Sequence, residues 1–487
     1  MSLRELIVSR KFGLLAISLA AGLRAIPEIL AGPYPVGWDP IAFYVPTTLY
    51  WAAGKASLLA IIGEAPFIYL ISVPLYLVGM NPIWTFKFMG PILYGFLSLS
   101  VFMFLSKNVK WSHRSSLAGS LLTSLYFVTL RIGWDMYRSV AGLSFLIMGM
   151  SLANGAGDAR KNLAFAGLVF LSVISDQFTG AVSLFIFGAI ACMHLLKRHR
   201  RQALDLTVAL IPGLIAFVFV IYAGLNAYST LYATQPPLGM TWTPLDAVAF
   251  LAYAYLPLLP FAIIGVRIAK TLEMALWSLL CIVGTFVSSI PAMGMQALGY
   301  RWALLLTVPL CIYSAVGLSR IARVHATNRR LLQLLRINAP RLFAIFLITF
   351  AFSYIFLPPA HPGAYFSAYP SLIPTSISQN TIPLSDSASV VALLHWFGES
   401  ATPSDVLIAH QAIYGWALEY LPSSIPVVNY GYRTPLDGVT IAISDGYSSI
   451  FLIWWVNGGG WFGQPVVPRS FVPVHFDGDF AIYEYKM

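Results

Sequence analysis

Charged residues are scarce in this sequence. Asp, Glu, Lys and Arg together make up 10% of its 487 residues, and hydrophobic residues make up 58%. A soluble globular chain usually carries about 25% charged residues, so this composition excludes an ordinary soluble enzyme and a disordered chain. The mean hydropathy of +0.76 indicates that much of the apolar surface needs lipid as its solvent. The composition therefore predicts an α-helical polytopic membrane protein.

Cysteine and the common catalytic signatures are also scarce. The three cysteines, Cys192, Cys281 and Cys311, all lie in apolar runs, where packing is their expected role and a disulfide scaffold is excluded. A phosphate-binding P-loop, a Rossmann glycine run, a Cys/His metal spacing and a Ser-His-Asp signature are not evident in the sequence. The sequence therefore offers no soluble-enzyme motif that would explain its function.

Long apolar runs are what the sequence does contain. A transmembrane helix needs about 20 apolar residues, and these runs predict about eleven transmembrane helices. The runs cover 12–31, 84–105, 116–132, 139–154, 162–176, 179–196, 203–224, 246–266, 272–292, 301–319 and 342–358. We expect the first run to be a retained span and not a cleaved signal peptide.

A further apolar run, 56–79, differs from the others because Glu64, Pro66 and Pro74 interrupt it. We interpret it as an interfacial helix within a first outer loop, 32–83. The alternative is a twelfth span. A twelfth span would break the alternation of basic loops described next, which favours the interfacial interpretation.

Most of the 29 Lys and Arg residues fall in alternate loops between the predicted spans. These residues are Arg4, Arg10, Lys11, Lys107, Lys110, Arg114, Arg160, Lys161, Lys197, Arg198, Arg200, Arg201, Arg267, Lys270, Arg320, Arg323, Arg329, Arg330, Arg336 and Arg341. Basic loops remain in the cytoplasm, so we predict a multi-pass plasma-membrane protein with a cytoplasmic N-terminus and an extracytoplasmic C-terminal domain. The net charge of +10 then indicates contact with membrane lipids, and we expect no nucleic-acid partner.

The composition changes after about residue 360, where Pro, Ser, Asn and acidic residues become frequent. Mixed apolar pieces at 405–409 and 449–454 predict short buried strands, and 387–397 predicts an amphipathic helix. We therefore expect two domains: a transmembrane domain, 1–360, and a small extracytoplasmic α/β domain, 361–487.

Unusual charges gather at the predicted outer ends of the spans. They are Asp39, Arg131, Asp135, Arg138, Asp176 and Arg301. An ionised side chain inside the bilayer is costly, so charges within or at the ends of spans mark a candidate functional site. Each predicted outer loop thus contributes a charged group to one shared cavity at the edge of the membrane. Such a cavity suits a substrate that is polar and anionic but is anchored in lipid.

Several of these charges have structural alternatives. Asp39 precedes Pro40 and could cap a helix, and Asp176 could cap the next span. Arg301 could extend toward lipid headgroups.

Other charges have a spacing that favours ion pairs. Arg131, Asp135 and Arg138 lie at i,i+4 and i,i+3 spacing and could form a ladder at the end of a span. Arg24 and Glu28 also lie at i,i+4 spacing inside the first span, where a structural pair is expected.

A resemblance to a known family rests on motifs in a fixed order. The segment Gly37–Tyr44 resembles the acidic first-loop motif of GT-C glycosyltransferases, which include oligosaccharyltransferases, protein O-mannosyltransferases and the aminoarabinose transferase of lipid A. Trp134–Gly142 is similar to the opening of span four in that family. Gly299–Trp302 is similar to the late span whose arginine meets a lipid phosphate, and 388–420 is similar to the outer domain. The order of these motifs and their common outward side carry the resemblance.

The sequence departs from the family at three places. Asp176 and Gln177 stand where many members carry a histidine turn. Trp454-Trp455 is followed by Val456, so the Trp-Trp-Asp signature of oligosaccharyltransferases is missing, which argues against transfer of a whole glycan to asparagine. The first loop carries Asp-Pro and not the Asp-Glu pair of protein O-mannosyltransferases.

The resemblance implies an enzyme of the cell envelope that transfers a sugar from a polyprenyl-phosphate donor to an acceptor, with inversion at the anomeric carbon. Asp39 is the candidate general base. Arg301 is the first candidate for the residue that binds the departing phosphate, and Arg138 is the second.

Asp135, Asp176 and Tyr44 complete the candidate substrate-binding site. Asp39, Asp135 and Asp176 could also hold a divalent ion, Mg²⁺ or Mn²⁺, through oxygen ligands; no cofactor is certain. The acceptor, whether glycan, lipid or protein, stays open.

Two alternatives belong to other classes of protein. A non-catalytic GT-C-like membrane subunit would carry the same motifs without turnover. A lipid or solute transporter would explain the spans, but it predicts charges midway along broken helices.

Overall fold

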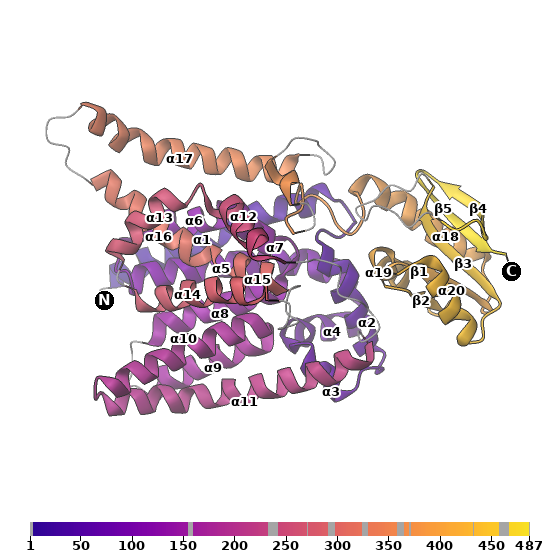
Figure 1. Cartoon of the computed structure of the whole chain (residues 1–487), viewed down its shortest axis with the longest axis horizontal. Coiled ribbons are helices and arrows are strands. Elements are labelled where there is room, and N and C mark those ends of the chain that lie inside the picture. The colour runs from indigo at the N-terminus through magenta and orange to yellow at the C-terminus, as the bar shows by residue number, and fades with distance from the viewer. Residues whose placement is uncertain are drawn as a thin grey trace.

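The computed structural model describes residues 3–153, 159–231, 242–269, 271–290, 298–323, 330–357, 365–369, 372–431, 433–456 and 467–486. Figure 1 shows a long body of helices and, at the end opposite the N-terminus, a smaller unit that contains the sheet. The predicted fold class, a polytopic helical membrane protein with a small C-terminal α/β domain, is confirmed. The predicted domain boundary at 360/361 lies outside the described residues.

A helix covers each of the apolar runs that the sequence predicts as spans. These helices are α1 (Leu3–Leu30), α5 (Pro82–Lys107), α6 (His113–Leu125), α7 (Phe127–Asp135), α8 (Tyr137–Ala153), α9 (Ala159–Ser175), α10 (Gln177–Leu196), α11 (Arg200–Leu231), α12 (Pro244–Tyr255), α13 (Leu259–Ile268), α14 (Leu272–Val287), α15 (Gly299–Leu305), α16 (Thr307–Arg323) and α17 (Arg330–Phe356). The ends of the predicted runs 139–154, 272–292 and 342–358 fall on residues that are not described.

Length and composition limit which of the described helices can cross a membrane unaided. Among the described residues, 6 helices are long and apolar enough to cross, or 8 if each bent pair is one span. The bent pairs are α6 with α7, at 67°, and α12 with α13, at 86°. The helices α8, α9 and α14 have 17, 17 and 16 residues, which at about 1.5 Å per residue is shorter than a hydrocarbon core of about 30 Å.

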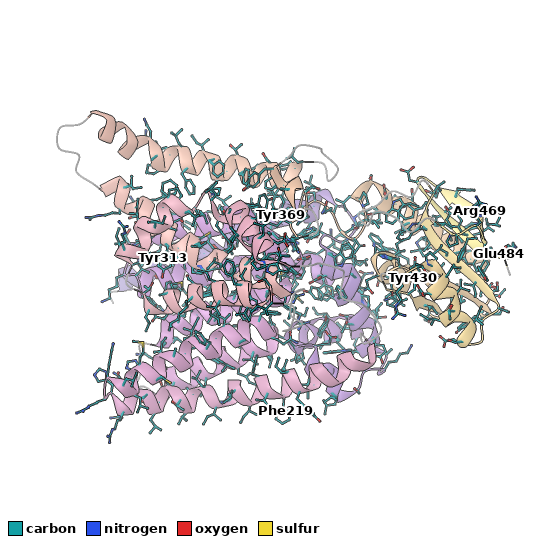
Figure 2. All side chains as sticks on the ribbon, in the orientation of Figure 1. Phe219, Tyr313, Tyr369, Tyr430, Arg469 and Glu484 are labelled. Carbon is teal, nitrogen blue, oxygen red and sulfur yellow. The ribbon has the colours of Figure 1, made fainter. Side chains whose placement is uncertain are left out.

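Apolar side chains on the outside of the body are the physical sign that lipid surrounds it. Leu214, Val218 and Phe219 of α11 are 52%, 59% and 58% exposed. Figure 2 places Phe219 on the outer side of α11, away from the other helices. Water would not tolerate so continuous an apolar face on a long helix, whereas a bilayer requires one.

The segment 32–83 forms short helices and no span. They are η1 (Pro40–Tyr44), α2 (Val45–Ala52), α3 (Leu58–Gly63), η2 (Pro66–Ile68) and α4 (Tyr69–Leu77). The run 56–79 breaks at Ala65, whose φ of 50° is unusual for a residue with a Cβ, and at Pro66. Each piece is therefore far shorter than a bilayer is thick, and the interfacial position of this run stays a prediction.

A mixed sheet with helices on it forms the C-terminal domain. Its elements are η5 (Tyr365–Ala368), η6 (Leu384–Asp386), α18 (Ser387–Ser400), β1 (Asp405–Ala409), α19 (Gln411–Tyr420), β2 (Val427–Asn429), α20 (Pro435–Ser444), β3 (Ser449–Trp455), β4 (Phe471–Asp477) and β5 (Phe480–Tyr485). The strand order is β2-β1-β3-β5-β4. Strand β1 is parallel to β2 and β3, and β5 is antiparallel to β3 and β4. Leu407, Leu452 and Ile482 are fully buried in its core.

The C-terminal domain holds η1 in place against the helical body. Gln411 Nε2 donates a hydrogen bond of 2.8 Å to the Ala42 carbonyl. A Cβ on Gly415 would lie 1.7 Å from the Ile41 carbonyl oxygen, so only glycine permits this approach of α19 to η1. Two bonds to the Gln379 carbonyl, from the Gly37 N–H at 2.9 Å and from the Trp134 indole at 3.0 Å, tie the same region to α7. The start of η1 is thereby fixed between two domains.

Candidate active site

A cavity of about 250 Å³ lies where η1, α8, α10 and α15 meet. It contains every predicted site residue except Asp135. The lining residues are Asp39, Phe43, Tyr44, Thr47, Glu64, Tyr69, Met136, Arg138, Ser139, Asp176, Gln177 and Arg301. Carboxylates and guanidiniums that are far apart in the sequence thus share one hollow, as the sequence predicts.

Asp39 stands at the N-terminal end of η1 and does not cap it. Its backbone is helical, and its side chain makes no capping hydrogen bond. Among the described residues, its carboxylate has one hydrogen bond, a long one of 3.3 Å from the Tyr44 hydroxyl. That hydroxyl has a single proton and lies closer, at 3.0 Å, to the Asp135 carbonyl. The Asp39 carboxylate is therefore largely available to a ligand.

The surroundings of Asp39 favour its protonated form. Burial and, to a smaller extent, the neighbouring Asp135 charge raise the pKa of Asp39 to about 7, against the opposing effect of Arg301, Arg131 and Arg138. A carboxyl group with a pKa near 7 can both accept and release a proton at neutral pH. Asp39 thus has the proton affinity that a general base requires.

Arg301 lines the cavity from the first turn of α15. Its Cζ lies 5.6 Å from the centre of the Phe178 ring, and its Nε donates a long bond of 3.4 Å to the Tyr300 hydroxyl. Within the described ranges, no carboxylate lies within 4.0 Å of this guanidinium. Its donors can therefore serve an anionic ligand in the cavity.

Arg138 is more heavily engaged than Arg301. It donates to Gln177 Oε1 at 2.9 Å and meets Glu64 Oε2 at 3.5 Å. Gln177 Nε2 in turn donates to the Gly63 carbonyl at 3.0 Å. The sequence prediction did not include Glu64 and Gln177 in the site. The signal for Glu64 was a charge beside a proline within an apolar run.

Asp135 does not line the cavity and forms an ion pair with Arg131. Arg131 Nε also donates to the Leu372 carbonyl at 2.7 Å. The ion-pair alternative thus holds for Arg131 and Asp135, while Arg138 turns into the cavity. Asp135 is thus outside the cavity in which it was predicted to bind substrate, although its charge still acts on Asp39.

Asp176 both lines the cavity and caps α10. Its Oδ2 accepts the Thr179 N–H at 3.1 Å, which is the capping alternative that the sequence left open. We expect Asp176→Ala to lower the free energy of unfolding by about 0.5–2 kcal/mol, and Asp176→Asn to preserve it because the amide oxygen can still accept the bond. Thermal unfolding of both variants measures this. Equal unfolding of Asp176→Ala and the parent would contradict the capping role, and a loss of activity in the stable Asp176→Asn would indicate contact with substrate.

The acidic residues do not fit a divalent metal site. Across the described ranges, no group of three or more His, Cys, Asp or Glu side chains could hold a metal ion. Asp135 forms an ion pair with Arg131, and one carboxylate oxygen of Asp176 accepts a hydrogen bond from the Thr179 N–H. Mg²⁺ and Mn²⁺ prefer several free oxygen ligands, and these residues do not supply them together. The reaction proposed for this cavity therefore has no step through a metal.

The helical body, the small α/β domain at one end of it and the apolar helices together define a polytopic helical membrane protein, and the charged cavity lies among elements of the helical body and its first loop. No protein-family model matches the sequence, and no curated protein matches it. Two solved structures of ArnT from Cupriavidus metallidurans share its fold. The structure bound to undecaprenyl phosphate has a TM-score of 0.53 and 13% identity, over 99% of this chain and 98% of that one. The apo structure has a TM-score of 0.54 and 13% identity, over 98% of both chains. The chain therefore shares the fold of these two ArnT structures over nearly its whole length.

Proposed function

We propose that this chain is a membrane glycosyltransferase that uses a polyprenyl-phosphate sugar as donor. The observation that carries the proposal is the shared cavity, in which the available carboxylate of Asp39 and the guanidinium of Arg301 face one space. An ArnT structure with the same fold binds undecaprenyl phosphate, which supports a lipid of this chemistry as the partner here.

The proposed reaction is a direct displacement at the anomeric carbon. Asp39 accepts the proton of an acceptor hydroxyl as its oxygen bonds to that carbon, and the bond from the carbon to the phosphate oxygen breaks. The electron pair leaves with the polyprenyl phosphate, whose growing negative charge Arg301 stabilises through hydrogen bonds. One displacement inverts the anomeric configuration.

Other cavity residues have supporting roles in this proposal. Arg138 adds a second positive charge, and the second oxygen of Asp176 orients a sugar hydroxyl. The exposed apolar side chains of the run 56–79, such as Leu58 at 73% and Leu70 at 59%, form the lipid-facing wall through which the donor enters. The alternation of basic loops in the sequence supports an extracytoplasmic position for this cavity.

The position of the charges favours this function over transport. A transporter site lies near the middle of broken spans. Asp39 precedes η1, Asp176 caps α10 and Arg301 lies in the first turn of α15, so all three are at helix ends. Charges at the ends of the helices can contact a lipid headgroup. A transporter would instead need charges deeper in the membrane to bind a substrate that crosses it.

The test is a transfer assay with purified protein and a panel of polyprenyl-phosphate sugars, in which release of polyprenyl phosphate is followed. We expect turnover with at least one donor and a rate that rises with pH through about 7, because Asp39 acts only after it loses its proton and its pKa lies near 7. Binding without turnover, for every donor and envelope acceptor tried, would contradict the enzyme and favour a non-catalytic subunit.

A further inference from the structure

The helix break between α7 and α8 carries part of the cavity wall. Met136, with φ −86° and ψ 56°, leaves the helical conformation, and Met136, Arg138 and Ser139 line the cavity just beyond it. A break of this kind interrupts the helical hydrogen bonds and leaves carbonyls at the end of the first helix in need of donors. The position of Arg138 therefore depends on the side chains that donate hydrogen bonds to the carbonyls at this break.

Arg24 of α1 supplies most of the donors. Its Nε donates to the Gly133 carbonyl at 2.7 Å, and its Nη2 donates to the Trp134 carbonyl at 3.1 Å and to the Tyr137 hydroxyl at 3.0 Å. The carbonyl of the next residue, Asp135, accepts from Tyr44 at 3.0 Å. Three successive carbonyls at the break are thus satisfied by side chains, and Arg24 satisfies two of them.

The Arg24 charge is itself compensated within the protein. Arg24 is fully buried, and its Nη2 lies 2.9 Å from Glu28 Oε1. Lys87 of α5 meets the other oxygen of Glu28 at 3.3 Å. A planar guanidinium can serve acceptors in several directions at once, which a lysine ammonium on a flexible stem cannot reproduce.

We infer that Arg24, which does not line the cavity, is a positioning residue: its guanidinium fixes the α7–α8 break and thereby the placement of Arg138 and Asp135 around Asp39. The inference rests on the proposed function, because it assigns a role in that reaction. Arg131, Asp135 and Arg138 lie on the two sides of the break. Arg301 and the Tyr44 hydroxyl face Asp39 from the other elements around it. A shift of the break therefore changes the charges that set the ionisation of Asp39.

The experiment compares Arg24→Lys with the parent in the transfer assay across the pH range in which Asp39 ionises. We expect kcat to fall by about 10²-fold, as for a small misplacement of a catalytic group, with a smaller change in KM and a shifted midpoint of the pH profile. The control is Asn108→Ala, which removes the 2.9 Å bond from Asn108 to the Met150 carbonyl at the far end of α8. The control keeps the parental midpoint and rate.

A milder variant, Tyr137→Phe, keeps the test valid if Arg24→Lys fails to fold. It removes only the hydroxyl that accepts from Arg24, and we expect a smaller change in the same direction. A folded variant of either kind with the parental kcat and pH midpoint would overturn the inference.

Undecaprenyl phosphate binding is measured in parallel, because it needs no turnover. Binding is expected to weaken in Arg24→Lys and in Tyr137→Phe, but not in Asn108→Ala. Absence of turnover in the parent would count against the proposed function alone. Parental affinity in both folded variants would overturn the role of Arg24 whether or not the parent is active.

Discussion

Asp39→Asn is expected to lower the rate of sugar transfer by about 10²–10⁴-fold, which is the usual contribution of a general base. The asparagine amide has the same shape as the carboxylic acid but cannot accept a proton from the acceptor hydroxyl. Initial rates with a saturating polyprenyl-phosphate sugar measure the effect. The residual rate should no longer rise with pH through about 7, because the group responsible for that rise is gone.

The Asp39→Asn protein should fold normally, since the Asp39 side chain makes no capping bond. Asp437→Asn is the matched control. It makes the same chemical change in the capping box of α20, in the C-terminal domain and outside the cavity, and should leave the rate and its pH dependence unchanged. A parental rate in Asp39→Asn would remove Asp39 from the role of base.

Arg301→Ala is expected to lower kcat by about 10²–10³-fold, the cost of removing one donor that stabilises charge in the transition state. The Arg301 guanidinium has no carboxylate partner within the described part of the chain, so its donors other than Nε, which bonds to the Tyr300 hydroxyl, are available to the phosphate. Undecaprenyl phosphate, the product analogue, should also bind more weakly to this variant. Single-turnover rates and lipid binding measure the two effects separately.

Arg301→Lys is expected to fall between the parent and Arg301→Ala, since lysine keeps the charge but cannot form a paired bond to phosphate. The control is Arg267→Ala, which removes an exposed arginine from the last turn of α13 and should bind and transfer like the parent. Equal rates and affinities in Arg301→Ala and Arg267→Ala would contradict the phosphate role of Arg301.

The apolar runs predicted where the helices lie, but not where two of them bend. The bend of 86° between α12 and α13 falls at Pro257, a residue that commonly ends a helix. The bend of 67° between α6 and α7 has no such signal. It falls at Tyr126, whose hydroxyl donates to the Ala254 carbonyl on α12. A contact between residues so distant in sequence is not encoded in local hydropathy.

The candidate site was predictable in part, because charged side chains at the same ends of packed spans lie at a similar depth and therefore close together. That reasoning placed Asp39 and Arg301 together, and the i,i+4 spacing of Arg131 and Asp135 signalled their ion pair. It could not predict Glu64, because the left-handed backbone of Ala65, with its φ of 50°, breaks the helix beside this carboxylate, which meets Arg138. The direction of a loop depends on tertiary contacts that a single sequence does not display.

An experimental structure with bound undecaprenyl phosphate tests the central claim most directly. We expect the phosphate in the cavity of Asp39 and Arg301, within hydrogen-bond distance of the Arg301 guanidinium, with the isoprenoid chain leaving along the run 56–79. A phosphate bound outside this cavity, with Arg301 making no contact to it, would contradict the account.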